Sequence, residues 1–274
     1  MTEGGGKAIE GATRIGGDFE PTAAPAWLDE RSSALDAIVA RSKAALAAMP
    51  KTAIKVTLPD GTVKEGVAFE TTPADIAGSI SKGLMNATCV ASVRYSKRLE
   101  GPGAAVVNAD ETDEDAANTD APSDWELWDA GRALEGDCEL QLHKFDDDKG
   151  KEVFWHSSAH ILGEALETLY GVKLTHGPAT TTGFFYDSYM GKTPVTPEMT
   201  AAVEKKVKQL TDAKAPFERV VVSKEEAAEL FKDNPFKQAN RSSRHGGGGG
   251  GGSGSGGSGS GSGGGGIARR WQWR

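Results

Sequence analysis

This sequence lacks the features that define secreted and membrane-spanning proteins. It holds only two cysteines, Cys89 and Cys138, and they lie far apart, which excludes a disulfide framework and favours a reducing compartment. No apolar run has the length needed to cross a membrane. The first residues, 1–17, lack the basic-then-apolar order of a signal peptide. We therefore expect a cytoplasmic protein without membrane spans.

Positive charge is also scarce relative to negative charge. The chain has 31 lysines and arginines against 39 aspartates and glutamates, for a formal net charge of -8. This balance argues against a protein built mainly to bind nucleic acid, although a single basic face is compatible with it. Glycine is abundant, with 36 residues, and many of them form the Gly/Ser run at 246–266. We expect roughly 190 residues to fold, because such a run cannot bury a core.

The N-terminal part of the chain divides into two segments. Residues 1–24 are rich in glycine and lack apolar periodicity, so we predict that they are disordered. Residues 25–50 form a predicted helix that Pro50 terminates. The apolar residues at helical spacing are Trp27, Leu28, Leu35, Ile38, Val39 and Leu46. We interpret this segment as a short coiled or docking helix without chemistry of its own.

Residues 51–146 have the pattern of a small β-grasp-like domain. Residues 53–58 alternate between apolar and polar as a strand does, and Pro59-Asp60-Gly61-Thr62 is a strong turn signal. Thr72 can cap a helix whose first residue is Pro73. This order of elements predicts a hairpin followed by a helix that returns the chain to the sheet.

Two more predicted strands, 89–93 and 138–142, flank an acidic insertion at about 101–124. Its acidic residues include Asp110, Glu111, Asp113, Glu114, Asp115 and Asp120. A composition rich in alanine, proline and asparagine as well as acids suits a solvated loop. An acidic docking loop is the alternative interpretation.

The segment 153–166 places two histidines four residues apart on a predicted amphipathic helix. His156 and His160 would share one face, because residues i and i+4 are neighbours on a helix surface. Two close imidazoles suit proton transfer near neutral pH or metal ligation. A catalytic zinc needs at least three protein ligands, and no nearby residue completes such a set, so we expect no metal. A pair of inert, hydrogen-bonded histidines is the alternative.

Residues 147–240 continue as the elements of a second domain. A helix is predicted from Thr196 to about Ala213, followed by a strand at 217–222. A capping box at Ser223 opens the next helix. We interpret these elements as scaffold.

Several motifs, in order, resemble the N-terminal part of threonyl-tRNA synthetases. Residues 56–61 and 71–77 are similar to the TGS domain of those enzymes, and residues 154–165 are similar to the start of their hydrolytic editing domain. The match continues through Gly177-Pro178, Gly183-Phe184-Phe185-Tyr186-Asp187 and Pro235-Phe236-Lys237. It covers about 25–238, and the order of the pieces is most similar to the eukaryotic cytosolic form.

The resemblance implies an α+β fold, with a β-grasp TGS domain at 51–146 followed by an incomplete α/β editing domain. It also implies hydrolysis of mischarged seryl-tRNA, because a pocket distinguishes side chains that differ by one methyl group by only about 1–3 kcal/mol. By resemblance, the site residues are His156, His160, Tyr186 and Lys237. They would orient a water, position the 3′-terminal ribose and stabilise charge at the ester carbonyl. A core aromatic and a surface lysine are the alternatives for Tyr186 and Lys237.

Two departures from the family pattern limit what this chain is expected to do. After Gln238 the family runs on to a Cys-Arg-Gly-Pro-His segment that completes the editing pocket, whereas here residues 239–245 lead into the Gly/Ser run. No ATP-binding motif is present, so the ATP, Mg and Zn sites of the full-length family are not expected, and the chain has no expected cofactor. We predict a fragment or truncated isoform of threonine–tRNA ligase that binds the acceptor end of threonine tRNA but does not aminoacylate it.

The C-terminal part, 241–274, is predicted to be a disordered Gly/Ser linker that ends in Arg269-Arg270-Trp271-Gln272-Trp273-Arg274. This ending resembles the Arg/Trp core of lactoferrin-derived antimicrobial peptides and suits anionic membrane interfaces or RNA. A gene-model error, a frameshift or an engineered fusion would explain it as well. Two alternatives to the enzyme fragment therefore remain: a non-catalytic TGS module that binds RNA or a protein partner, and a scaffold that displays the peptide.

Overall fold

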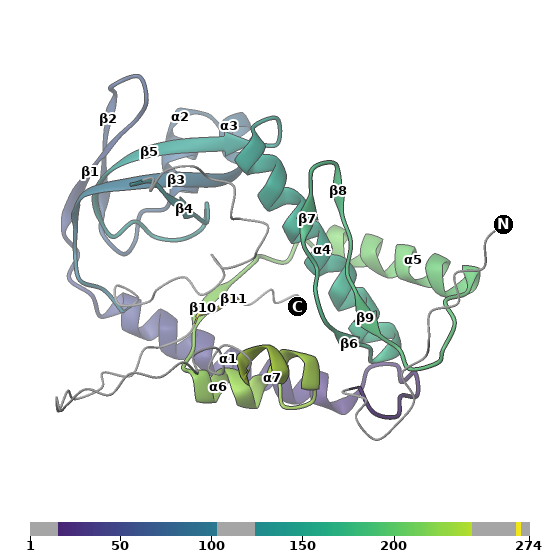
Figure 1. Cartoon of the computed structure of the whole chain (residues 1–274). Helices are drawn as coiled ribbons and strands as arrows, with labels where there is room; N and C mark the ends of the chain where they lie inside the picture. Colours follow the sequence, from purple (N-terminus) through teal and green to yellow (C-terminus); the bar gives the residue numbers. More distant parts are fainter. Residues whose placement is uncertain (1–15, 103–123, 243–266, 270–274) are drawn as a thin grey trace, which may run out of the picture.

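The computed structural model describes residues 16–102, 124–242 and 267–269, and it shows two units connected by one long helix (Figure 1). The first unit is a sheet with helices. The second unit consists of helices and short strand pairs around helix α4 (Asp148–Tyr170), which begins beside the sheet and runs through the second unit. Among the described residues, no helix is long and apolar enough to span a membrane.

The sheet of the first unit has the strand order β2-β1-β5-β3-β4. Its strands are β1 (Ala53–Thr57), β2 (Val63–Val67), β3 (Thr88–Arg98), β4 (Glu126–Trp128) and β5 (Gly136–Lys144). Strands β1 and β5 pair in parallel, and the other neighbouring strands are antiparallel. Helices α2 (Pro73–Ile80) and α3 (Lys82–Ala87) connect β2 to β3. The predicted sheet with a helix after its first hairpin is therefore confirmed.

Local hydrogen bonds explain why the first turn and the first helix start of this sheet could be predicted from the sequence. The Asp60 carboxylate accepts the backbone N–H of Thr62 at 2.9 Å, and Gly61 has φ +82°, a region that favours glycine. Thr72 and Asp75 form the predicted cap, because each side chain accepts the backbone N–H of the other, at 3.1 and 2.9 Å. The turn and the helix start are thus fixed by contacts within four residues.

The core of the first unit lies against one face of the sheet. Its most deeply buried side chains are Val56, Val93, Trp128, Leu134 and Leu140, each at most 1% exposed. Burial of a large apolar side chain stabilises a fold by about 1.5–3 kcal/mol. This core is complete without any residue from the second unit.

Helix α1 (Ala26–Ala47) packs on the second unit, although it precedes the first unit in the sequence. A separate core joins it to strand β10 (Arg219–Val221) and helix α6 (Lys224–Leu230). The buried residues of this core are Ile38, Val39, Val220, Val222 and Leu230. Figure 1 shows α1 beside α6. The predicted docking helix is present, and the surface on which it docks comes late in the chain.

The second unit has α4 at its centre, and Gly171 ends this helix with φ +62°. Beside α4 lie two short antiparallel sheets of two strands each. One pairs β6 (Lys173–Leu174) with β9 (Ser188–Tyr189), and the other pairs β7 (Ala179–Thr180) with β8 (Gly183–Phe184). The remaining elements are α5 (Pro197–Ala213), β10 (Arg219–Val221), α6 (Lys224–Leu230) and α7 (Pro235–Ser242). The helices predicted after Thr196 and Ser223 are confirmed, and both side chains cap them.

Residues 16–24 pack onto the second unit, which differs from the disorder predicted for 1–24. The backbone N–H groups of Thr22 and Ala24 donate to carbonyl oxygens in the last turn of α4, at 3.1 and 2.8 Å. Lys173 donates to the carbonyl of Gly16 at 3.1 Å. These contacts depend on a distant helix end, so a composition rich in glycine could not reveal them.

The C-terminal tail also differs from its prediction where it is described. Strand β11 (Ile267–Arg269) pairs antiparallel with β10, with Ala268 opposite Val220. The prediction of an unstructured tail is therefore wrong for this segment. An edge strand carries unpaired N–H and C=O groups that accept a second strand. The predictions for 1–15, for the acidic insertion at 103–123, and for 243–266 and 270–274 lie outside the described residues.

Candidate functional site

The two predicted site histidines stack on one face of α4. The ring centroids of His156 and His160 lie 4.9 Å apart, and their planes meet at 17°. Both side chains are half-buried. One helical turn separates the two residues, which is the distance that allows two flat rings to lie over each other. The predicted shared face is present.

Tyr186 lies beside this pair, as predicted. Its ring meets the ring of His160 edge-on, with centroids 5.9 Å apart and planes at 72°. Two glycines make room for it: a Cβ atom on Gly163 would lie 2.9 Å from the Tyr186 ring, and one on Gly177 would lie 2.5 Å from it. Burial and the negative charge of Glu167 raise the pKa of the Tyr186 hydroxyl, so that it remains a proton donor across neutral pH.

Lys237 lies on helix α7, and its side chain contacts the residue that follows β6. Asn234, which is 3% exposed, fixes the start of this helix, because its side-chain oxygen accepts the backbone N–H groups of Phe236 and Lys237. The side-chain N–H of Asn234 donates to the carbonyl of Leu174 at 2.8 Å, which ties α7 to β6. Lys237 Nζ donates to the carbonyl of Thr175 at 3.2 Å. The lysine is therefore held by the fold at the end of β6.

A buried carboxylate lies on the same face of α4, seven residues after His160. Glu167 is 9% exposed, and both of its oxygens accept from Arg31 Nη1 at 3.1 Å. The guanidinium of Arg31 also lies over the rings of Trp27 and Phe231, at 4.5 and 5.2 Å from their centroids. Burial raises the pKa of Glu167, and the charge of Arg31 opposes this rise. The pair connects α1 to the helix that carries the histidines.

A second carboxylate, Glu164, follows His160 by one helical turn. Burial, reinforced by Glu167, raises its pKa to about 8, against the opposing charge of Lys206 on α5. Its Oε2 atom is buried and has no hydrogen-bond partner among the described residues. A carboxyl group that holds its proton near neutral pH, one turn of α4 after a half-buried histidine, is a feature of catalytic and binding sites.

The sequence predicted the histidines, Tyr186 and Lys237 as candidate site residues, and this stays a prediction; it did not point to three charged residues on or against α4, namely Glu164, Glu167 and Arg31. Glu164 and Glu167 follow His160 at i+4 and i+7, so the helical periodicity could have placed them on the same face. Arg31 carried no such signal. It lies 136 residues before Glu167, on a helix that has the appearance of an independent extension.

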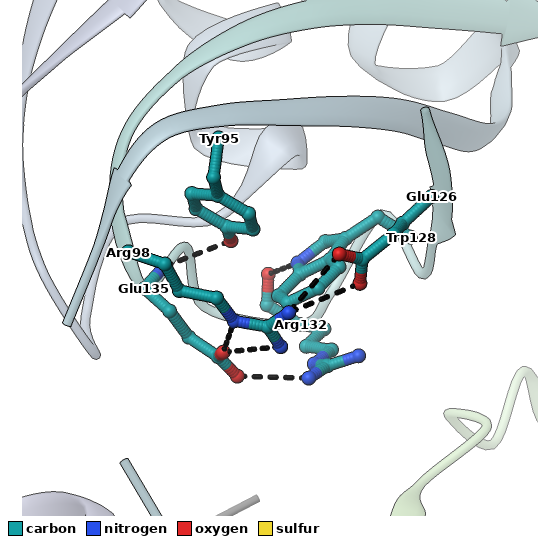
Figure 2. Close-up of polar contacts among 6 residues, drawn as sticks. All are labelled: Tyr95, Arg98, Glu126, Trp128, Arg132 and Glu135. Carbon is teal, nitrogen blue, oxygen red and sulfur yellow. Dashed lines mark hydrogen bonds and ion pairs between the residues drawn. The ribbon is translucent and has the colours of Figure 1, made fainter. Parts of the chain in front are cut away.

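A different polar cluster lies in the first unit (Figure 2). The two oxygens of Glu135 accept from Arg98 and Arg132, each at 2.8 Å, and Arg98 also pairs with Glu126 at 3.0 Å. The Arg132 guanidinium lies 3.4 Å from the centroid of the Trp128 ring. The charges of this cluster satisfy one another. We therefore interpret this cluster as structural: it holds the segment between β4 and β5 against the sheet.

The described residues contain no group of three or more His, Cys, Asp or Glu side chains that could hold a metal ion. Cys89 and Cys138 are free thiols on β3 and β5, and burial raises the pKa of each. The side chains described in this subsection carry imidazole, phenol, ammonium and carboxyl groups.

Comparison with known families gives a match in the first unit. The TGS domain family matches residues 54–144, a range that runs from β1 to the end of β5. The strands and helices described above are thus those of a TGS domain.

Comparison with curated proteins extends the similarity into the second unit. The chain is 41% identical over 214 residues to threonine–tRNA ligase, mitochondrial 1, of Arabidopsis thaliana, which covers 77% of this chain and 26% of that protein. It is 38% identical over 221 residues to probable threonine–tRNA ligase 1, cytoplasmic, of Dictyostelium discoideum (81% and 27%), and 38% identical over 213 residues to threonine–tRNA ligase, cytoplasmic, of Caenorhabditis elegans (78% and 25%). The chain spans about a quarter of the length of these relatives.

Proposed function

From the premise that this chain carries a TGS domain within a stretch homologous to the N-terminal part of threonine–tRNA ligases, we propose that its second unit holds part of a site for the aminoacylated 3′ end of threonine tRNA. The observation that carries the proposal is the stacked pair His156 and His160, with Tyr186 packed against it. Lys237 on α7 contacts Thr175, whose backbone N–H donates to the carbonyl of Asp187, the residue after Tyr186. We further propose that the protein acts in the cytoplasm.

The reaction that fits these groups is hydrolysis of a seryl ester on the terminal ribose. The oxygen of a water attacks the ester carbonyl carbon, the bond from that carbon to the ribose oxygen breaks, and the ribose oxygen takes up a proton. One histidine accepts a proton from the attacking water, and the stacked histidine or the Tyr186 hydroxyl donates one to the leaving oxygen. The ammonium of Lys237 stabilises negative charge at the carbonyl or the adjacent phosphate.

The need for such a site follows from the limits of binding selectivity. Serine differs from threonine by one methyl group, which a binding pocket distinguishes by only about 1–3 kcal/mol. A second site that hydrolyses the seryl ester removes the product that the first selection lets through. The half-buried imidazoles, the phenol and the ammonium group supply the proton-transfer and charged groups that this hydrolysis needs.

The proposal is tested with 3′-deoxy-3′-(L-serylamino)adenosine, whose amide resists hydrolysis. We expect the ring signals of His156 and His160 to shift in NMR titrations, while the signals of His176, an exposed histidine outside the pair, stay in place. Seryl-tRNA hydrolysis should fall by about tenfold or more in His156→Ala and His160→Ala but not in the matched control His176→Ala. Shifts that are absent, or equal for all three histidines, would contradict the proposal.

A further inference from the structure

Strand β10 has an edge that a distant part of the chain occupies. Strand β11 pairs with it antiparallel in a sheet of two strands, with Val220 opposite Ala268. Residues 243–266 lie between the end of α7 and the start of β11. We propose that this edge of β10 is a binding site for an extended peptide segment, and that the chain's own residues 267–269 fill it reversibly. This inference goes beyond the proposed function and does not depend on it.

The helices of the second unit hold β10 in an extended form. Val220 in this strand and Val222 just after it are each 2% exposed, and both belong to the core that joins β10 to α1 and α6. Glu218, the residue before β10, forms an ion pair with Lys43 of α1 at 2.6 Å. The main-chain groups along the edge of β10 are therefore arranged for a partner in advance, so that pairing orders little of this side of the contact.

The partner that such an edge recognises is a backbone rather than a particular side chain. A strand added to a sheet edge is held by hydrogen bonds between main-chain N–H and C=O groups, which every residue except proline offers in full. Residues 267–269 meet this requirement, because they contain no proline. The edge of β10 therefore fits an extended segment without proline.

The short length of β11 makes the pairing reversible. Strand β11 has three residues, which permit only a few main-chain hydrogen bonds, each of modest net strength. A free peptide of this size binds weakly. A segment of the same chain has an advantage, because a covalent connection raises its local concentration to about the millimolar range. We therefore expect the chain's own segment to occupy the edge and a free peptide to compete only at millimolar concentrations.

The test measures hydrogen exchange of the β10 backbone amides in the whole folded chain. In an antiparallel pair, one of two successive residues donates its N–H to the partner strand, and proline has no N–H to donate. We therefore expect Ile267→Pro/Ala268→Pro to speed exchange in the peptide that spans 219–221 by about fivefold or more. The matched control, Ser260→Pro/Ser262→Pro, also adds two prolines after α7 but leaves β11 intact, and it should exchange like the wild type.

A second measurement adds the segment as a separate peptide. The probe is a capped peptide with the sequence of residues 265–270, added at about 5 mM to Ile267→Pro/Ala268→Pro. We expect exchange at 219–221 to slow again by about twofold or more, because the peptide fills the edge that the variant tail leaves open. The control peptide has proline in place of its isoleucine and alanine. It has the same charge, and it should have no effect.

The control peptide is needed because a cationic peptide is attracted to a chain with a formal net charge of -8. If both peptides slow exchange equally, charge explains the binding and the inference is overturned. It is also overturned if neither peptide slows exchange, or if the two proline variants exchange at the same rate. Protection of β10 should not change between about 5 and 200 μM wild-type protein. Protection that increases with concentration would show that β11 comes from a second copy, which contradicts filling by the chain's own segment.

Discussion

The two units of this chain differ in how their buried carboxylates are paired with positive charges. In the TGS domain, Glu135 is 6% exposed and has two arginine partners that lie in the same unit. In the second unit, the one ion-pair partner of Glu167 among the described residues is Arg31, which lies on α1, 136 residues earlier in the chain. Glu164 has an oxygen without a hydrogen-bond partner in the same part of the chain. The first unit is self-contained, whereas the second depends on α1.

This difference separates a structural cluster from a candidate site. In the first unit each charge of the Glu135 cluster is paired with another charge of that cluster, so no charge is left to bind a ligand. Buried carboxyl groups with raised pKa values, such as Glu164 and Glu167 on the helix that carries the histidines, cost stability, and such a cost is typical of catalytic and binding sites. The comparison leads to four expectations, ordered by the size of the effect.

The largest effect should come from removing one arginine in each unit. Arg31→Met leaves Glu167 buried without its partner, so we expect it to lower the free energy of unfolding by about 3 kcal/mol. Arg98→Met leaves Glu135 with Arg132, so its loss should be about 1 kcal/mol. Denaturant unfolding followed by circular dichroism measures both. Equal losses would remove the distinction between the two clusters.

Two glycines allow a comparison of packing. Gly177→Ala places a Cβ atom 2.5 Å from the Tyr186 ring, so we expect a loss of about 1–3 kcal/mol and weaker binding of the seryl analogue. Gly131→Ala in the TGS domain meets no atom within 4 Å, and its effect should stay within about 0.5 kcal/mol. Thermal unfolding and the binding titration of both variants check this. A tolerated Gly177→Ala would mean that the tyrosine is free to move.

The proton on Glu164 gives the third expectation. The pKa of this group is raised to about 8 in the folded chain, so its contribution to stability is fully present below its ordinary pKa and is lost as the pH rises through 8. Glu164→Gln should therefore stabilise the protein by about 1–2 kcal/mol at pH 9 and change little at pH 4.5. Unfolding midpoints across this range test it, and a gain that is the same at both pH values would show that ionisation is not the cause.

Much of the fold was predictable because its signals are local. The turn at Asp60 and the caps at Thr72 and Ser223 are each fixed by hydrogen bonds that span two or three residues. The spacing of His156 and His160 placed them on one face for the same reason. Each of these predictions rests on residues that are at most four positions apart in the sequence.

The rest of the site depends on contacts that no local pattern records. The docking of α1 requires a core that closes between Val39 and Val220, and the pairing of Arg31 with Glu167 requires that core first. The pairing of β11 with β10 depends on an open edge that exists only in the folded chain. Sequence periodicity identifies the face of α4 that carries the two histidines. Tertiary packing decides which charged side chains from other elements contact that face.

The smallest effect concerns the contact between the two units. His143 on β5 shares a 2.8 Å hydrogen bond with Ser92 on β3, and Lys149 in the first turn of α4 donates to Ser92 at 3.1 Å. Burial, reinforced by the charge of Lys149 and opposed by Asp147, lowers the pKa of His143. The fully buried serine thus connects the TGS sheet to the helix that carries the candidate site.

A histidine whose pKa is lowered on folding adds stability at pH values above its ordinary pKa, and this contribution is lost as the pH falls below it. Protonated His143 would also place a second cation beside Lys149. We therefore expect the unfolding midpoint of the wild type to fall more between pH 7.5 and about 5.5 than that of His143→Asn, which cannot titrate. His176→Asn, at an exposed position, is the control and should follow the wild type. If His143→Asn also follows the wild type, the contact between the units does not respond to pH, and the two units differ only in their internal charges.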